Sequence, residues 1–273
     1  MKKATLLSFC FLFLIGCTSN DADLIIHNAD IYTVNKEFDK ATALVVKNGK
    51  FIAVGGEDLL EMYDAKSVVD LNGFPVYPGF IDAHAHFSNF SSQAIGAQIL
   101  PPPDAGANNM EAIVRILKEW NTPENRALTG WIFGAGFDDS VLEEKRFPTK
   151  HDLDQVTTEF PIMIIHISGH FAVVNSKGLE LLNITSKTKN PEGGLIRREN
   201  GNEPNGVLEE LAAIPYYAKA LAPKTKEAAD MFFESGQNMA LSFGYTTAQE
   251  GRAMLENHDM LAKAAEAGKL KLD

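Results

Sequence analysis

Residues 75–87 read Pro-Val-Tyr-Pro-Gly-Phe-Ile-Asp-Ala-His-Ala-His-Phe, and this stretch decides how the rest of the chain is interpreted. The segment from Phe80 to His86 is expected to be extended, following a Pro-Gly turn. Side chains two residues apart on a strand point to the same side, so His84 and His86 face one way. Two imidazoles at that spacing can bind one metal ion at about 2.0–2.1 Å each. The pattern therefore predicts His84 and His86 as metal ligands.

Asp82 lies on the same side of the expected strand and has two possible roles. Its carboxylate could orient a ligand histidine from behind, as carboxylates do at many metal sites. It could equally accept a hydrogen bond from a loop amide two residues further on. Residue types and spacing leave both roles open.

The complete pattern Pro-Gly-x-x-Asp-x-His-x-His is much more specific than a bare His-x-His pair. It resembles the amidohydrolase superfamily of metal-dependent hydrolases. The resemblance implies an α/β fold, a distorted (β/α)8 barrel resembling a TIM barrel, whose first strand ends in the two histidines. Many members also carry a small β-sandwich before the barrel. Short strand-like runs between residues 23 and 76, with an Asn48-Gly49 hairpin turn, fit the N-terminal part of such a sandwich.

More than 150 residues separate His86 from the next clear barrel-type strand, Gly244–Thr247. We therefore expect a barrel segment over 77–273 that is interrupted by a long α/β insertion at about 88–242. An ordered set of segments fills this region and resembles amidohydrolase family 3, which includes N-substituted formamide deformylases and relatives of D-aminoacylase. The segments are Trp131–Asp138, Phe147–Asp154, Pro161–His170, Val174–Leu179, Pro191–Gly194 and Pro204–Glu210.

Four polar residues in and after the insertion are candidates for a substrate site: His170, Asp138, Asn175 and Glu250. His170 follows a predicted strand and a glycine, a common place for a pocket residue. Asn175 could instead be the N-cap of a helix ending near Leu182. Glu250 follows the second barrel-type strand, at the edge where barrel active sites form, but it could also be a charge near a helix start.

The family resemblance implies further residues that these 273 do not supply. In the superfamily, additional histidines come from strands five and six, a bridging carboxylate from strand four, and a catalytic Asp from strand eight. We therefore expect the general-base Asp to lie beyond residue 273, and the barrel present here to be incomplete. The chain is then interpreted as the N-terminal part of a longer protein, inactive by itself.

The resemblance also implies the chemistry. One or two divalent ions, with Zn²⁺ expected, would activate water to hydrolyse a C–N bond in a small amide, N-acyl or N-formyl substrate. The alternative is an envelope lipoprotein that keeps a hydrolase-like fold and binds small ligands without turnover. The formal net charge of −11 makes the chain a poor general binder of nucleic-acid phosphate.

The N-terminus has the pattern of an exported bacterial lipoprotein. Lys2 and Lys3 precede an apolar run that is too short to span a bilayer, and the run ends in Leu-Ile-Gly-Cys at Cys17. This resembles a lipobox, so residues 1–16 are predicted to be a signal peptide and Cys17 the lipidated residue, followed by a tether over 17–22. The expected location is the cell envelope, where the lipid anchors the protein facing the periplasm or the exterior.

Overall fold

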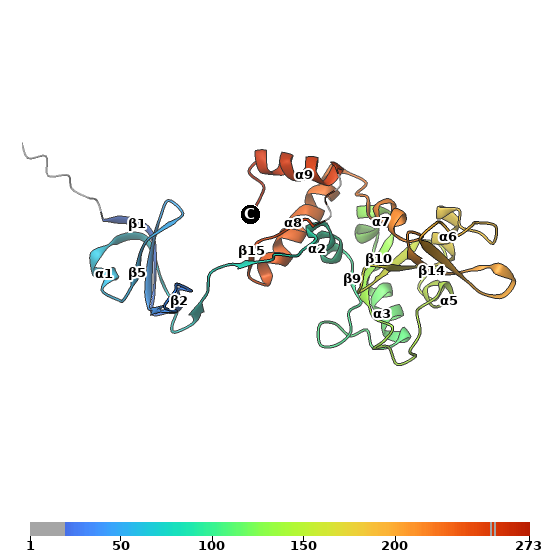
Figure 1. Cartoon of the computed structure of the whole chain (residues 1–273), viewed down its shortest axis with the longest axis horizontal. Helices are drawn as coiled ribbons and strands as arrows, with labels where there is room; N and C mark the ends of the chain where they lie inside the picture. The colour runs from blue at the N-terminus through green and yellow to red at the C-terminus, as the bar shows by residue number, and fades with distance from the viewer. Residues whose placement is uncertain (1–19, 252, 254) are drawn as a thin grey trace, which may run out of the picture. The chain divides into compact units, whose positions relative to one another are not determined.

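The computed structural model describes residues 20–251, 253 and 255–273 (Figure 1). The predicted signal peptide and Cys17 lie outside the described residues. Contacts between residues divide the chain into two compact units that meet between Pro78 and Gly79. The expected division fell two residues earlier, after residue 76. The fold as a whole is mixed α/β.

The described part of the first unit, residues 20–78, consists of two small sheets and one short helix. A four-stranded sheet has the order β5-β4-β1-β6, and a three-stranded sheet has the order β3-β2-β7. The Asn48-Gly49 turn joins β4 to β5 as expected, with both residues at positive φ. The elements are β1 Asp21–His27, β2 Asp30–Tyr32, β3 Lys40–Ala41, β4 Ala43–Lys47, β5 Lys50–Gly55, α1 Leu59–Met62, β6 Asp64–Asp70 and β7 Pro75–Val76.

The second unit contains a six-stranded sheet with the order β13-β14-β12-β11-β10-β9. Strands β9, β10 and β11 run parallel, whereas β12, β14 and β13 are joined by antiparallel pairing. The whole sheet lies within the segment expected to be an insertion. Its strands are β9 Ala97–Gln98, β10 Ile132–Phe137, β11 Ile162–His166, β12 Phe171–Val174, β13 Gly194–Arg198 and β14 Pro204–Glu210.

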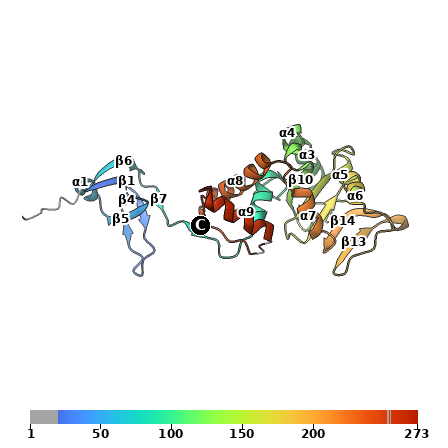
Figure 2. The same ribbon diagram turned by 90° about the horizontal axis from the view of Figure 1, so that it is seen from above.

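Both faces of this sheet are buried under helices, as Figures 1 and 2 show for α3 and α7 on opposite sides of β10. Strand β11 explains why: Ile162 and Ile164 pack into one hydrophobic core and Met163 into the other, and all three are fully buried. The helices are α3 Met110–Trp120, α4 Pro123–Thr129, α5 Lys150–Asp154, α6 Ser176–Leu182 and α7 Ile214–Leu221, with a 3₁₀ turn at Asn200–Asn202.

One expected helix is replaced by a strand. The sequence pattern predicts a helix from Val207 to about Ala220, but β14 occupies Pro204–Glu210 and α7 begins only at Ile214. The physical reason is that Val207 and Leu208 point into the two different cores on opposite faces of the sheet. That alternation has the period of a strand and not of a helix.

The remaining elements of the second unit include the two strands that were expected to belong to a barrel, which we call the barrel-type strands. Strand β8 (Phe80–Ile81) pairs parallel to β15 (Tyr245–Thr247), and Asp273 exchanges two backbone hydrogen bonds with Thr246 and Ala248. Among the described residues there is no closed barrel. The helices here are α2 Phe87–Ile95, α8 Lys226–Ser242 and α9 Leu255–Glu266.

Helices α2 and α8 pack closely because a glycine lies where they touch. A methyl group on Gly236 of α8 would lie 2.1 Å from Oγ of Ser91, a fully buried residue of α2. This contact joins the chain before the six-stranded sheet to the chain after it, next to β8 and β15 (Figure 1). No helix in the described part of the chain combines the length and apolar character needed to cross a membrane.

Candidate metal centre

The segment that carries His84 and His86 is extended over a shorter range than expected. Strand β8 ends at Ile81, and α2 begins directly after His86. Between them the chain bends, since Oδ1 of Asp82 accepts a hydrogen bond from the amide of His84 at 3.1 Å. The expectation of a continuous strand from Phe80 to His86 was therefore wrong. This hydrogen bond fits the role of a loop cap for Asp82, and its role in orienting a ligand histidine stays a prediction.

The bend keeps the two histidines near each other. The ring centroids of His84 and His86 are 6.0 Å apart, and the rings are close to perpendicular at 76°. Both residues follow the carboxyl end of β8, which is the strand end where active sites of parallel α/β folds are built.

Backbone hydrogen bonds hold this segment against the end of β15. The amide of Asp82 donates to the carbonyl of Thr247 at 3.0 Å, and that of Phe87 donates to Gln249 at 3.2 Å. The amide of Gly251 donates back to the carbonyl of Ala85 at 2.8 Å. These bonds place Glu250 directly across a β-bridge from His86.

Glu250 is the predicted site residue that the structure brings closest to the histidine pair. Its side chain is only 8% exposed, and its Oε1 lies 3.6 Å from Nδ1 of His86. Its other oxygen, Oε2, accepts a hydrogen bond from the amide of Ser88 at 2.9 Å, in the first turn of α2. Nδ1 of His86 is buried and has no hydrogen-bond partner of ordinary geometry within the described residues.

Asp138 belongs to a second polar group, with Asp139 and His166. These residues follow β10 or end β11, which are neighbouring parallel strands, and their ligand-type atoms lie within 4.8 Å of one another. Nε2 of His166 is 3.2 Å from Oδ1 of Asp139 and 4.0 Å from Oδ1 of Asp138. Hydrogen bonds from the hydroxyl and amide of Ser140 hold the pKa of the Asp138 carboxyl below its usual value.

The hydrogen bonds of His166 bear on whether this second group suits a metal. The amide of Ser168 donates to Nδ1 of His166 at 3.1 Å, so Nδ1 carries no proton. In a neutral ring the proton is then on Nε2, the nitrogen that faces the two carboxylates. A histidine must present an unprotonated nitrogen to a metal ion. The three residues could supply metal ligands, but this hydrogen bonding favours direct contact between His166 and the carboxylates.

His170 and Asn175 lie at different points of the inserted sheet. His170 is mostly exposed, and its Nδ1 is 2.9 Å from Oε2 of Glu210, so its expected substrate role stays a prediction. Asn175 is fully buried and is the N-cap of α6, as expected. Its amide group accepts hydrogen bonds from the amides of Ile162 and Gly178 and donates two, to Thr157 and Phe160. These four bonds use the whole capacity of the side chain and leave nothing for a substrate.

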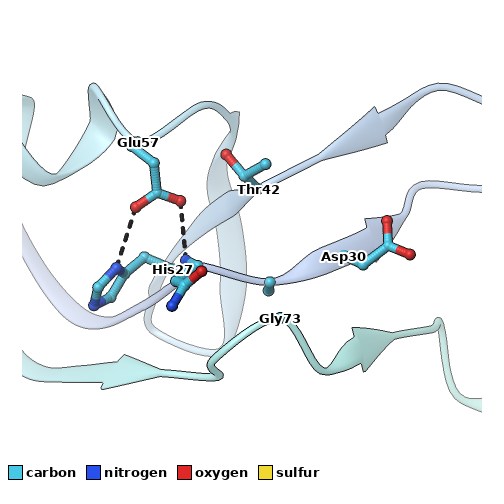
Figure 3. Close-up of a pocket in the computed structure, with 7 residues that line it drawn as sticks. His27, Asp30, Thr42, Glu57 and Gly73 are labelled. Carbon is cyan, nitrogen blue, oxygen red and sulfur yellow. Dashed lines mark hydrogen bonds and ion pairs between the residues drawn. The ribbon is translucent and has the colours of Figure 1, made fainter.

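Two open surface pockets are lined by none of these residues. One has a volume of about 480 Å³ and is lined by residues of the first unit that include His27, Asp30, Thr42, Glu57 and Gly73 (Figure 3). Glu57 accepts from the amide of Asn28 at 2.9 Å and lies 3.1 Å from Nδ1 of His27. The amide of Asn28 holds the pKa of the Glu57 carboxyl below its usual value. The second pocket, of about 410 Å³, lies between α8 and α9.

With this geometry in place, comparison with known proteins identifies the family. The model of the amidohydrolase family matches residues 67–273. The chain belongs to the amidohydrolase family. Its curated relatives include the N-substituted formamide deformylase of Arthrobacter pascens, which is 31% identical over 91% of this chain and 46% of its own length. YtcJ of Bacillus subtilis is 28% identical over 80% of this chain and 42% of its own length.

Solved structures agree with the fold of an amidohydrolase. A chain described as an uncharacterized metal-dependent hydrolase from Pyrococcus horikoshii superposes with a TM-score of 0.61 and 24% identity, over 92% of this chain and 47% of that one. A hydrolase with the same description from Pyrococcus furiosus gives 0.60 and also 24% identity. This chain spans about half the length of the curated relatives named above.

Asp139 and Gly251 were not singled out from the sequence of this amidohydrolase, although the signal for Asp139 was available. Asp138 and Asp139 directly follow one strand of a parallel pair and His166 ends the other, and the carboxyl ends of parallel strands meet at one edge of the sheet. His166 lies on an apolar run, a pattern that favours a core histidine with satisfied hydrogen bonds and so does not indicate this group. No sequence pattern indicated Gly251, since its role depends on the ring that lies against it.

Proposed function

We propose that the protein is a metal-dependent hydrolase that cleaves a C–N bond in small amide substrates. His84 and His86 would hold a divalent ion, for which we propose Zn²⁺, in a site of one or two ions. The observation that carries this proposal is the pair of imidazoles beside the carboxyl ends of two parallel strands, one of them backed by a buried carboxylate.

The residues present fit a metal ion in two respects. Imidazole nitrogens are among the preferred ligands of Zn²⁺. In addition, Nδ1 of His86 is buried and faces a carboxylate, an arrangement that leaves Nε2 as the nitrogen available to a metal. Because catalytic zinc sites use about three protein ligands, we propose that further ligands come from outside the 273 residues.

In this mechanism the chain's own residues have defined tasks. A bound metal ion lowers the pKa of its water to about 7 and polarises the scissile carbonyl. His84 and His86 hold the site at the end of β8, and the backbone bonds between residues 82–87 and 247–251 keep it rigid. The proton of the water needs an acceptor, and we assign this task to an Asp beyond residue 273.

The substrate class rests on similarity. The relative from Arthrobacter pascens is named as a deformylase of N-substituted formamides. We therefore propose an N-formyl or N-acyl group on a small amine or amino acid as the substrate. We further propose that lipidated Cys17 anchors the protein in the bacterial envelope, where such amides would be encountered after export.

Metal content and hydrolysis test this function directly. A version of the protein that spans the full length of its relatives is loaded with Zn²⁺, dialysed and measured by elemental analysis. The variants His84→Ala, His86→Ala and the control His258→Ala, which alters a largely exposed histidine beside Asp259, are measured in the same way. We expect zinc in the wild type and in the control, and its loss from both site variants. Zinc in the His84→Ala and His86→Ala variants equal to that in the wild type would overturn the metal site.

The reaction needs its own assay. A panel of N-formyl and N-acetyl amines and amino acids is incubated with a version of the protein that spans the full length of its relatives, with and without chelator. Release of formate or acetate that chelator abolishes would support the hydrolase. Zinc binding without turnover of any member of the panel would instead support a ligand-binding envelope lipoprotein.

A further inference from the structure

We propose that Glu250 is a positioning residue that holds His86 in the tautomer with its proton on Nδ1. The inference rests on the proposed metal site and adds a residue to it. It begins from the contact between Oε1 of Glu250 and Nδ1 of His86, 3.6 Å apart, in a place where both groups are shielded from water.

Burial makes the contact consequential. A buried nitrogen without a partner is costly, and the cost falls when Nδ1 carries a proton that it donates to a nearby acceptor. Glu250 supplies a carboxylate, which only accepts when it is ionised. The distance is slightly longer than an ordinary N–H···O hydrogen bond, and a small rotation of either side chain closes it.

Glu250 is itself held in place. Its Oε2 accepts from the amide of Ser88, and its backbone lies across a bridge from that of His86. Hydrogen bonds between backbone amides and carbonyls of residues 82–87 and 247–251 fix the distance between these two segments. The backbone bridge therefore sets where the Glu250 side chain starts, and the bond from Ser88 holds its carboxylate beside the imidazole.

The consequence for metal binding follows from the chemistry of the ring. With the proton on Nδ1, the lone pair of His86 is on Nε2, the nitrogen on the side of the ring away from Glu250. With the proton on Nε2, that nitrogen has no lone pair with which to bind a metal ion. Carboxylates behind ligand histidines act in this way, and their loss costs about 10–100-fold in metal affinity.

The chain contains a matched control in its first unit. Glu57 makes the same pair of contacts, with one oxygen accepting from the amide of Asn28 and the other 3.1 Å from Nδ1 of His27, although its side chain is half exposed (Figure 3). A change of Glu to Gln at position 57 is therefore chemically identical to the same change at position 250. It acts on a histidine that is not part of the proposed metal site.

The experiment measures ring tautomers and metal affinity in the same samples. Long-range ¹H–¹⁵N NMR of the metal-free protein assigns the protonated nitrogen of His86, and titration with Co²⁺ gives the affinity. In Glu250→Gln, the amide can still accept from Ser88 but presents a donor to Nδ1. We expect the His86 proton to move to Nε2 and Co²⁺ affinity to fall about 10–100-fold. In Glu57→Gln we expect a change at His27 alone, with unchanged affinity.

Glu250→Asp keeps a carboxylate and is expected to retain the Nδ1–H tautomer and most of the affinity. A wild-type protein with the His86 proton on Nε2 would overturn the inference, as would Glu250→Gln that binds Co²⁺ as tightly as the wild type. If the wild type binds no Co²⁺ at all, the proposed metal site fails, whereas the tautomer of metal-free His86 still decides the role of Glu250.

Discussion

Gly251 lies against the imidazole of His86 with no space for a side chain. A methyl group on Gly251 would be 3.2 Å from Cε1 of that ring and 2.9 Å from the carbonyl oxygen of Ala85. The second contact is closer than real methyl groups come to backbone oxygens, and that oxygen accepts the hydrogen bond from the amide of Gly251 itself. The position of the His86 ring therefore depends on a residue 165 positions away in the chain.

Gly251→Ala is expected to weaken metal binding at the histidine pair. The new methyl group forces the backbone bond to Ala85 or the His86 ring to shift, because it would lie 2.9 Å from the carbonyl oxygen of Ala85 and 3.2 Å from Cε1 of the ring. We expect Co²⁺ affinity to fall by about tenfold, the lower limit for disturbing groups that orient a metal ligand. Gly106→Ala is the control, since a methyl group there meets no atom within 4 Å. Equal affinity in both variants would show that the site tolerates the shift.

Asp152 gives a prediction of how stability depends on pH. Burial by itself raises the pKa of its carboxyl, but hydrogen bonds from Arg146 and from Thr149 outweigh burial and leave the pKa below its ordinary value. Because the folded-state pKa lies below that of the unfolded chain, the ionised carboxylate adds stability above about pH 4. This contribution is lost as the pH falls through the lower, folded-state pKa.

The variant Asp152→Asn is therefore expected to be less stable than the wild type by about 1 kcal/mol at pH 7, the usual value for a weakened helix cap. The difference should shrink as the pH is lowered below about 4, because the wild type then loses the same contribution. Urea unfolding at pH 7 and pH 3, followed by circular dichroism, measures both values. A difference that stays constant or grows on acidification would contradict the assignment.

The two barrel-type strands were predictable because their signals are local. The Pro-Gly turn before Phe80 and the Gly-x-Thr-Thr run at Gly244–Thr247 mark β8 and β15. The spacing of apolar residues between Lys224 and Leu241 likewise predicts a long helix, and α8 lies there. What could not be predicted is the end of β8 at Ile81. It depends on how far β15 pairs with it and on the hydrogen bond from the amide of His84 to Asp82.

Prediction of the candidate site from the sequence is also limited by contacts between segments that are distant in the chain. Residue types and spacing were enough to select His84, His86 and Glu250, but the contact between His86 and Glu250 depends on a bridge between segments more than 160 residues apart. The wrong helix at Val207 has a related cause. The apolar residues of that segment fit the period of a helix and the period of a strand equally well over a short range. Burial against a core on each face of one sheet decides in favour of a strand.

Cys17→Ser tests the predicted lipid anchor, which lies outside the described residues. If Cys17 is lipidated, the variant loses palmitate labelling and leaves the membrane fraction or accumulates as an unprocessed precursor. Cys10→Ser is a matched control, since residue 10 lies within the predicted signal peptide and would be removed on cleavage. Labelling that is unchanged in Cys17→Ser would show that the Leu-Ile-Gly-Cys segment is not a lipobox.

Asn175→Ala is expected to act on folding before it acts on any substrate. The wild-type amide satisfies two buried backbone amides and two backbone carbonyls, from residues 157, 160, 162 and 178. Removing it leaves these groups without partners in a fully buried place, which costs about 1–3 kcal/mol for each unsatisfied group that water cannot reach.

The comparison variant is Asn109→Ala, which removes the N-cap of α3 and a single side-chain bond, to the amide of Ala112. That loss is expected to cost about 1 kcal/mol. Thermal unfolding should therefore show a clearly larger drop in Tm for Asn175→Ala. If the two variants unfold at the same temperature and only Asn175→Ala impairs substrate binding, the residue has a role in the pocket that its hydrogen bonds do not reveal.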